Sequence, residues 1–135
     1  MCDHLDILAQ NRKEDLTGAL HQLDSFLAKH VLPPAQRYAV RLAFEELASN
    51  VIRHQTALCA FSVAIDLSPL SMMFKDDGSV FNPLEHTVAP DIALPLEQRV
   101  AGKLGIHLLR SMVPSMTYER CGHENVIRLQ FENGE

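Results

Sequence analysis

One acidic and one amide side chain in the middle of this sequence have a spacing that could serve phosphate chemistry. Glu46 and Asn50 are four residues apart, so they share one face of a helix, and His54 continues the row. The amide oxygen of Asn50 suits Mg²⁺, which takes oxygen ligands and accepts most of them from water and phosphates. Glu46 could orient or deprotonate an attacking hydroxyl, whereas Glu45 lies well away from Asn50. Taken alone, the row is more typical of a solvated polar helix face.

A second segment pairs a carboxylate with a glycine at the end of a strand. A carboxylate only accepts hydrogen bonds, so Asp76 could accept one from the exocyclic amine of adenine and repel the oxygen of guanine. Strand alternation puts Asp76 on the inward face with Phe74 and turns Asp77 outward. Gly78 would let the backbone approach a ring closely. An Asp-Gly turn without a ligand explains the same residues.

A third segment places two glycines at the start of a predicted helix. The free backbone amides and the helix dipole favour a phosphate there, and Lys103 could add a positive charge. The candidate phosphate-binding residues are therefore Gly102, Lys103, Leu104 and Gly105. A flexible helix entry without a ligand is the alternative. His54 could also contact phosphate, although a surface histidine is the simpler interpretation.

Length and composition restrict the class of protein. A chain of 135 residues, nearly half of them apolar, is expected to form one globular domain over 1–135. The net charge of -5 argues against a nucleic-acid partner. No apolar run is long enough to span a membrane, and acidic residues near the start argue against a signal peptide. Three cysteines without ligand spacing fit reduced thiols in a cytoplasmic protein.

Hydrophobic periodicity predicts an α+β fold, a two-layer sandwich of helices on a sheet. A long surface loop with at most a short helical piece is expected over 84–101, and loops of this length often act as lids. Asn11, with Glu14 behind it, is expected to cap the first helix. The expected elements are a strand over 5–9, helices over about 12–27, 34–54 and 105–113, and strands over 61–67, 72–76, 117–121 and 126–131.

Together these segments resemble the GHKL ATPase superfamily, which includes gyrase, chaperone and histidine kinase types. Within it the chain looks most like the small bacterial anti-sigma-factor serine/threonine kinases, over about 5–131. The resemblance rests on the following residues: Glu46-x-x-x-Asn50 for the N box, Asp76-x-Gly78 for the first glycine box, Phe81-Asn82-Pro83 for the Phe-Asp-Pro often found just after that box, Gly102 to Gly105 with the helix to Arg110 for the second glycine box, and Tyr118-Glu119-Arg120 with Asn125 for the closing hairpin.

The resemblance implies a Bergerat ATP-binding fold, with a mixed, mostly antiparallel sheet and helices on one face. It implies that ATP and Mg²⁺ are bound, that Asn50 holds the metal, that Glu46 is the catalytic base and that Asp76 binds adenine. Members of this branch phosphorylate a serine or threonine on a STAS-domain anti-anti-sigma protein, and many sequester a sigma factor as homodimers. The chain departs from the common pattern at Val80 and Lys103, where many members have glycine.

Three functions are consistent with these residues. The first is a protein-serine/threonine kinase that also acts as an anti-sigma factor, and the presence of Glu46 favours it because a pure switch needs no base. The alternative is a non-catalytic regulatory module whose partner affinity depends on bound ATP. A third, an ATPase that hydrolyses ATP for its own conformational cycle, is disfavoured because such machines use further domains.

Overall fold

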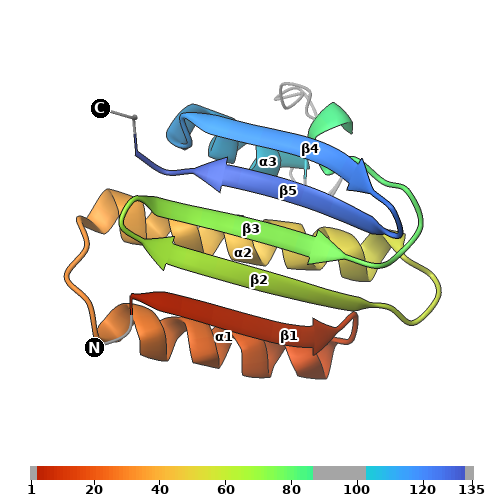
Figure 1. Cartoon of the computed structure of the whole chain (residues 1–135), viewed down its shortest axis with the longest axis horizontal. Helices are drawn as coiled ribbons and strands as arrows, with labels where there is room; N and C mark the ends of the chain where they lie inside the picture. Colours follow the sequence, from red (N-terminus) through yellow and green to blue (C-terminus); the bar gives the residue numbers. More distant parts are fainter. Residues whose placement is uncertain (1–2, 87–102, 133–135) are drawn as a thin grey trace, which may run out of the picture.

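The computed structural model describes residues 3–86 and 103–132 (Figure 1). None of the helices in these two ranges is both long and apolar enough to cross a lipid bilayer. The elements in chain order are β1 (His4–Gln10), α1 (Lys13–Ala28), α2 (Pro34–His54), β2 (Ala60–Leu67), β3 (Leu70–Asp76), the 3₁₀ turn η1 (Pro83–His86), α3 (Lys103–Met112), β4 (Ser115–Cys121) and β5 (Glu124–Gln130). Every predicted helix and strand is present, with ends that differ by at most two residues.

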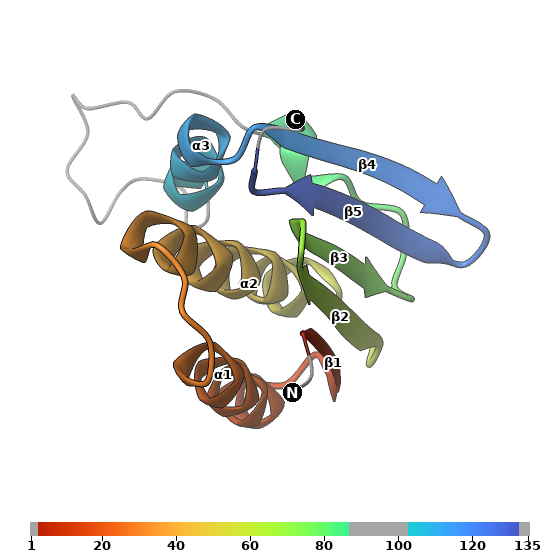
Figure 2. The same ribbon diagram turned by 60° about the vertical axis from the view of Figure 1, so that its left-hand side comes forward.

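The strands form one open sheet in the order β1-β2-β3-β5-β4. All three helices lie on one side of it, α1 near β1, α2 behind the middle strands and α3 behind β4 and β5 (Figures 1 and 2). The predicted two-layer α+β sandwich is therefore confirmed. The resemblance implied a mixed sheet, but every neighbouring pair of described strands is antiparallel.

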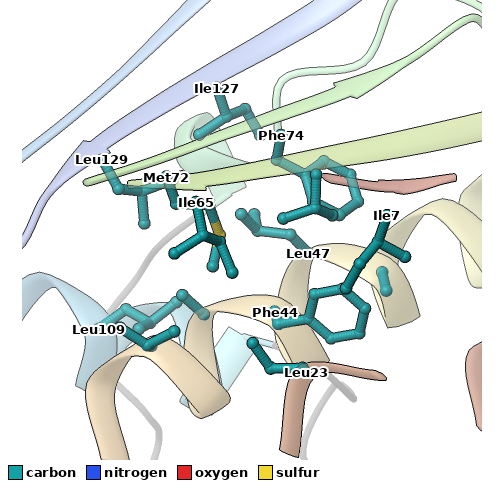
Figure 3. Close-up of a cluster of buried hydrophobic side chains, with 14 of the residues drawn as sticks. Ile7, Leu23, Phe44, Leu47, Ile65, Met72, Phe74, Leu109, Ile127 and Leu129 are labelled. Atoms are coloured by element: carbon teal, nitrogen blue, oxygen red, sulfur yellow. The ribbon is translucent and has the colours of Figure 1, made fainter. Parts of the chain in front are cut away.

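The core lies between the sheet and the helices, as strand alternation requires. Ile7, Val63, Phe74 and Ile127 stand side by side in one row across four strands, and all four are buried. Phe44 and neighbouring apolar residues of α2 pack against this row from the helical layer (Figure 3). Since burying one large apolar side chain contributes roughly 1.5–3 kcal/mol, this layer holds α2 firmly on the sheet.

The predicted capping role of Asn11 is wrong. Helix α1 begins after Arg12, which makes no side-chain cap. The Asn11 amide instead donates to the carbonyl oxygens of Gln55 (3.2 Å) and Ala57 (3.0 Å), and its oxygen accepts the backbone N–H of Cys59 (2.9 Å). The Asn11 side chain therefore binds three backbone groups of the α2–β2 connection and does not cap α1.

The closing hairpin is tighter than predicted. The strands predicted over 117–121 and 126–131 leave four residues between them, but β4 ends at Cys121 and β5 begins at Glu124, so the turn contains two residues. Gly122 adopts a φ of 59°, which glycine accepts without steric cost and which matches the twist of a two-residue hairpin. The short turn fixes the register that pairs Asn125 with Arg120 on one side and with Asp76 on the other.

Candidate nucleotide-binding site

The C-terminal half of α2 forms the common wall of the candidate site. It carries Glu46, Asn50 and His54 on the helix that the sequence predicted for them. Asn50 is buried with 5% of its surface exposed, Glu46 is half-buried and His54 is exposed. The start of α3 lies against Glu46, and the segment after β3 lies against His54 and Gln55 at the end of the helix.

Glu46 lies against the first turn of α3. A Cβ built on Gly105 would overlap the carboxylate carbon and both carboxylate oxygens of Glu46, so only glycine leaves room for this side chain in its present position. Burial raises the pKa of Glu46, the nearby charge of Arg53 opposes that rise, and Glu45 adds to it. A carboxyl whose pKa is moved towards neutrality is a better proton acceptor than an ordinary surface glutamate.

The amide oxygen of Asn50 is held by an arginine one turn further along α2. The Nη2 atom of Arg53 donates to Asn50 Oδ1 at 2.5 Å. Arg53 lies three residues after Asn50, so the two side chains meet on one helical face. The oxygen predicted to bind Mg²⁺ therefore faces a cation of the protein itself.

Asp76 points into the protein, as strand alternation predicted, while Asp77 is exposed. Its Oδ1 atom accepts the backbone N–H of Gly78 (3.0 Å) and the side-chain amide of Asn125 (2.9 Å). Its Oδ2 atom accepts no hydrogen bond from any of the described residues. Burial raises the pKa of Asp76, and the bonds from Asn125 and Gly78 and the charge of Arg120 oppose that rise. The carboxylate is thus fixed at one oxygen and available at the other.

Asn125 is the centre of a buried hydrogen-bond network that joins four segments, and only 1% of its surface is exposed. Besides Asp76, its amide donates to the carbonyl oxygen of Ser79 (2.8 Å). Its oxygen accepts the backbone N–H of Phe81 (3.1 Å) and the hydroxyl of Tyr118 (2.6 Å). All donors and acceptors of this side chain are used, so the network fixes the segment after β3 in one conformation.

Gln55, at the end of α2, clamps the same segment from the other side. Its amide donates to the carbonyl oxygen of Ser79 (2.8 Å), and its Oε1 atom accepts the backbone N–H and the hydroxyl of Ser79 (both 2.9 Å). A Cβ on Gly78 would lie 2.6 Å from that Oε1 atom, so a larger residue there would displace the clamp. Arg120 adds a hydrogen bond to the carbonyl oxygen of Gly78 (2.8 Å). The helix with Glu46 and Asn50 is thereby tied directly to the segment that follows Asp76.

The remaining predicted residues are placed only in part. The ring of His54 stacks on Phe81, with ring centroids 4.3 Å apart, so it helps to hold the segment after β3. Gly102 lies outside the described residues. Lys103 and Leu104 belong to the first turn of α3, but their side chains lie outside the described part. Of the four candidate phosphate-binding residues, the structure therefore describes the backbone of Lys103, Leu104 and Gly105 at the start of α3.

The donor set fits Mg²⁺ better than a metal that needs several protein ligands. Within residues 3–86 and 103–132, no group of three His, Cys, Asp or Glu side chains could hold a metal ion. Asn50 offers a hard oxygen, with the Glu46 carboxylate one turn away. Mg²⁺ commonly takes one or two protein oxygens and completes its shell with water and phosphate oxygens.

Two residues of this site, Arg53 and Gln55, were missed in the sequence. Arg53 could have been found, because a residue three positions after Asn50 must share its helical face. Gln55 gave no signal, since its importance comes from Ser79, which is distant in the sequence. Asn125 was noted only through the resemblance, and its position opposite Asp76 depends on the register of three strands.

Comparison with known proteins agrees with this geometry. The model of the histidine kinase-like ATPase domain family matches residues 9–131, a span that contains all the site residues described above. A search of curated proteins finds no match to the chain. The family match covers most of the chain, and it includes both the residues around Glu46 and Asn50 and those around Asp76. The protein therefore belongs to the histidine kinase-like ATPase domain family and is an ATP-binding module of the GHKL type.

Proposed function

We propose that this protein is an ATP-dependent serine/threonine-protein kinase of the anti-sigma-factor type. Its substrate would be a serine or threonine hydroxyl on a STAS-domain anti-anti-sigma protein, and it would sequester a sigma factor or a similar regulator. The observation that carries this proposal is the position of Glu46. Its carboxylate is half-buried, has a raised pKa and lies against the N-terminal turn of α3, where phosphates would be held.

In this proposal each residue has one task. The Oδ2 atom of Asp76 accepts a hydrogen bond from the adenine amine, and Asn50 would hold Mg²⁺ through its amide oxygen. Glu46 accepts the proton of the serine hydroxyl as its oxygen bonds to the γ-phosphorus, and the bond from that phosphorus to the β–γ bridging oxygen breaks to release ADP. Bound Mg²⁺ would offset negative charge on the phosphates. The backbone amides at the start of α3 act on the same charge.

Incubation with labelled ATP and candidate STAS proteins tests the proposal, with phosphoserine or phosphothreonine as the product detected. Glu46→Gln should bind ATP almost as well as the wild type and lose phosphate transfer by about a hundredfold or more. Glu45→Gln is the matched control, because Glu45 pairs with Arg41 on the surface at 3.1 Å, and it should retain transfer. Undiminished transfer by Glu46→Gln would show that Glu46 is not the base. ATP binding without transfer to any STAS protein would favour the non-catalytic regulatory module.

A further inference from the structure

Arg53 occupies the one protein oxygen that the proposed function assigns to the metal. The hydrogen bond from its guanidinium to Asn50 Oδ1 is short, at 2.5 Å, and the acceptor side chain is buried. A hydrogen bond with a charged donor is stronger than one between neutral groups. A metal ion bound to the same oxygen would lie close to this positive charge, so we expect the guanidinium to move away before the ion binds.

The same guanidinium also acts on Glu46. Its positive charge opposes the effect of burial on the pKa of that carboxyl. Arg53 thus acts both on the oxygen proposed to bind the metal and on the neighbouring carboxylate.

A free Mg²⁺ ion would gain little by displacing Arg53. In the described part of the chain no cluster of acidic, histidine or cysteine side chains waits to complete its coordination shell. Mg²⁺ also gives up its water ligands reluctantly. An ion carried by a triphosphate or diphosphate already has oxygen ligands, so it needs only Asn50 from the protein.

The surroundings of Arg53 allow it to move without a change in the backbone. The residue is exposed and lies at the last turn of α2. Together with Asn11, Gln55 and Leu58 it lines an open hollow of about 460 Å³ beside the end of that helix. The hollow offers space beside Arg53 into which its side chain could turn away from Asn50.

We propose that Arg53 is a specificity-determining residue that holds Asn50 in the nucleotide-free protein and yields it only to a metal ion carried by a nucleotide. The inference rests on the proposed function, because it takes Asn50 as the metal ligand. Its consequence is that the site rejects free divalent cations and accepts the metal–nucleotide complex.

The test measures binding of Mn²⁺ alone, by electron paramagnetic resonance, to the nucleotide-free protein. Arg53→Met should bind Mn²⁺ at least about tenfold more tightly than the wild type, since a hydrogen bond from a charged donor contributes at least that factor. Adding Asn50→Leu to this variant should abolish the gain. Arg12→Met, which removes an exposed cation at the start of α1, controls for net charge and should change nothing. Equal Mn²⁺ affinity in Arg53→Met and the wild type would overturn the proposal.

Titration of the wild type with Mn²⁺ and ADP separates this inference from the proposed function. If the wild type does not bind the Mn²⁺–ADP complex, the proposed nucleotide site is contradicted, and with it both the proposed function and the role of Arg53. If it binds the complex but Arg53→Met shows no gain for Mn²⁺ alone, only the role of Arg53 falls. If Arg53→Met does not fold, nuclear magnetic resonance of the wild-type Arg53 guanidinium provides the test. Its resonances should shift when Mg²⁺ and ADP are added together and should not shift with Mg²⁺ alone. A full shift with Mg²⁺ alone would overturn the proposal.

Discussion

The two ends of the candidate site differ in how completely the protein itself holds their side chains. At the end proposed to bind adenine, here called the adenine end, Asp76 is fixed at one oxygen by Asn125 and Gly78, and Gln55 clamps the segment that follows. At the end proposed to bind phosphate and to catalyse transfer, here called the phosphate end or catalytic end, Glu46 is held by packing against Gly105, and Asn50 accepts a hydrogen bond from Arg53. We therefore expect a rigid adenine end and a more adjustable phosphate end, joined by α2.

The largest effect should come from breaking the adenine end at its centre. Asn125→Ala removes four hydrogen bonds from a buried network, those with Asp76, Ser79, Phe81 and Tyr118, although Asp76 and Ser79 each keep one other hydrogen bond. Because one hydrogen bond contributes roughly 0.5–1.5 kcal/mol, we expect the free energy of unfolding to fall by about 3 kcal/mol. Urea denaturation measures it.

Arg128→Ala provides the control on the same strand. Arg128 is exposed and pairs with Glu119 at 2.9 Å, an ion pair expected to contribute less than about 1 kcal/mol. If the two variants lose equal stability, the buried network does not have the importance given to it here.

A smaller loss is expected when the clamp between the two ends is removed. Gln55→Ala deletes the three hydrogen bonds to Ser79, and we expect the free energy of unfolding to fall by about 2 kcal/mol. Amide hydrogen exchange should become faster at Ser79, whose N–H loses its acceptor. Thr56→Ala, at the neighbouring exposed position, should leave exchange at Ser79 unchanged. Unchanged exchange in Gln55→Ala would mean that the segment is held without the clamp.

Two glycines within helices, Gly105 at the phosphate end and Gly18 far from it in α1, allow a matched comparison. A Cβ at Gly18 of α1 meets nothing within 4 Å, so Gly18→Ala should stabilise the protein by about 0.5–1 kcal/mol through helix propensity. Gly105→Ala brings the same gain but pushes the Glu46 carboxylate aside. Its stability should therefore change by less than about 1 kcal/mol, because the end of a side chain can move.

Function should separate the same two variants. Gly105→Ala should lose most phosphate transfer to the proposed STAS-domain substrate, since the proposed base is displaced, while Gly18→Ala should keep it. Transfer assays with labelled ATP measure the difference. Full transfer by Gly105→Ala would contradict the link between this contact and the catalytic end.

The smallest effect concerns the pH dependence of stability. Because burial raises the pKa of Glu46, the folded protein binds that proton more tightly than the unfolded chain does. The corresponding stability is present below the ordinary pKa of 4.5 and is lost as pH rises through the raised pKa. Glu46→Gln should therefore show a shallower fall in the free energy of unfolding above that pH, measured by urea denaturation across the range. Parallel curves for variant and wild type would contradict the raised pKa.

Local patterns in the sequence predicted most of the fold. Strand alternation placed Phe74 and Asp76 inside, and helical spacing brought Glu46 and Asn50 to one face, because both depend only on backbone geometry. The capping role of Asn11 failed because a tertiary partner, the connection after α2, competed with the local one. Local rules cannot rank two such partners.

The candidate site could be predicted only where one element carries the residues. Asn125 and Gln55 meet the segment after Asp76 through a strand register and a helix end that no short pattern fixes. Arg53 is different, because its spacing from Asn50 in the sequence already predicts a shared helical face. Only the structure shows that Arg53 donates a hydrogen bond to Asn50. The adenine end therefore depends on tertiary structure more than the catalytic end does.

The most direct test of the account is nucleotide selectivity, measured as the stabilisation of the wild type by Mg²⁺ with ATP or GTP. At one hundred times its dissociation constant, ATP should raise the free energy of unfolding by about 2.7 kcal/mol. GTP at the same concentration should have little effect, because its oxygen would face the free Oδ2 atom of Asp76. Equal stabilisation by GTP, or none by ATP, would contradict the claim that Asp76 reads adenine in a site built on α2.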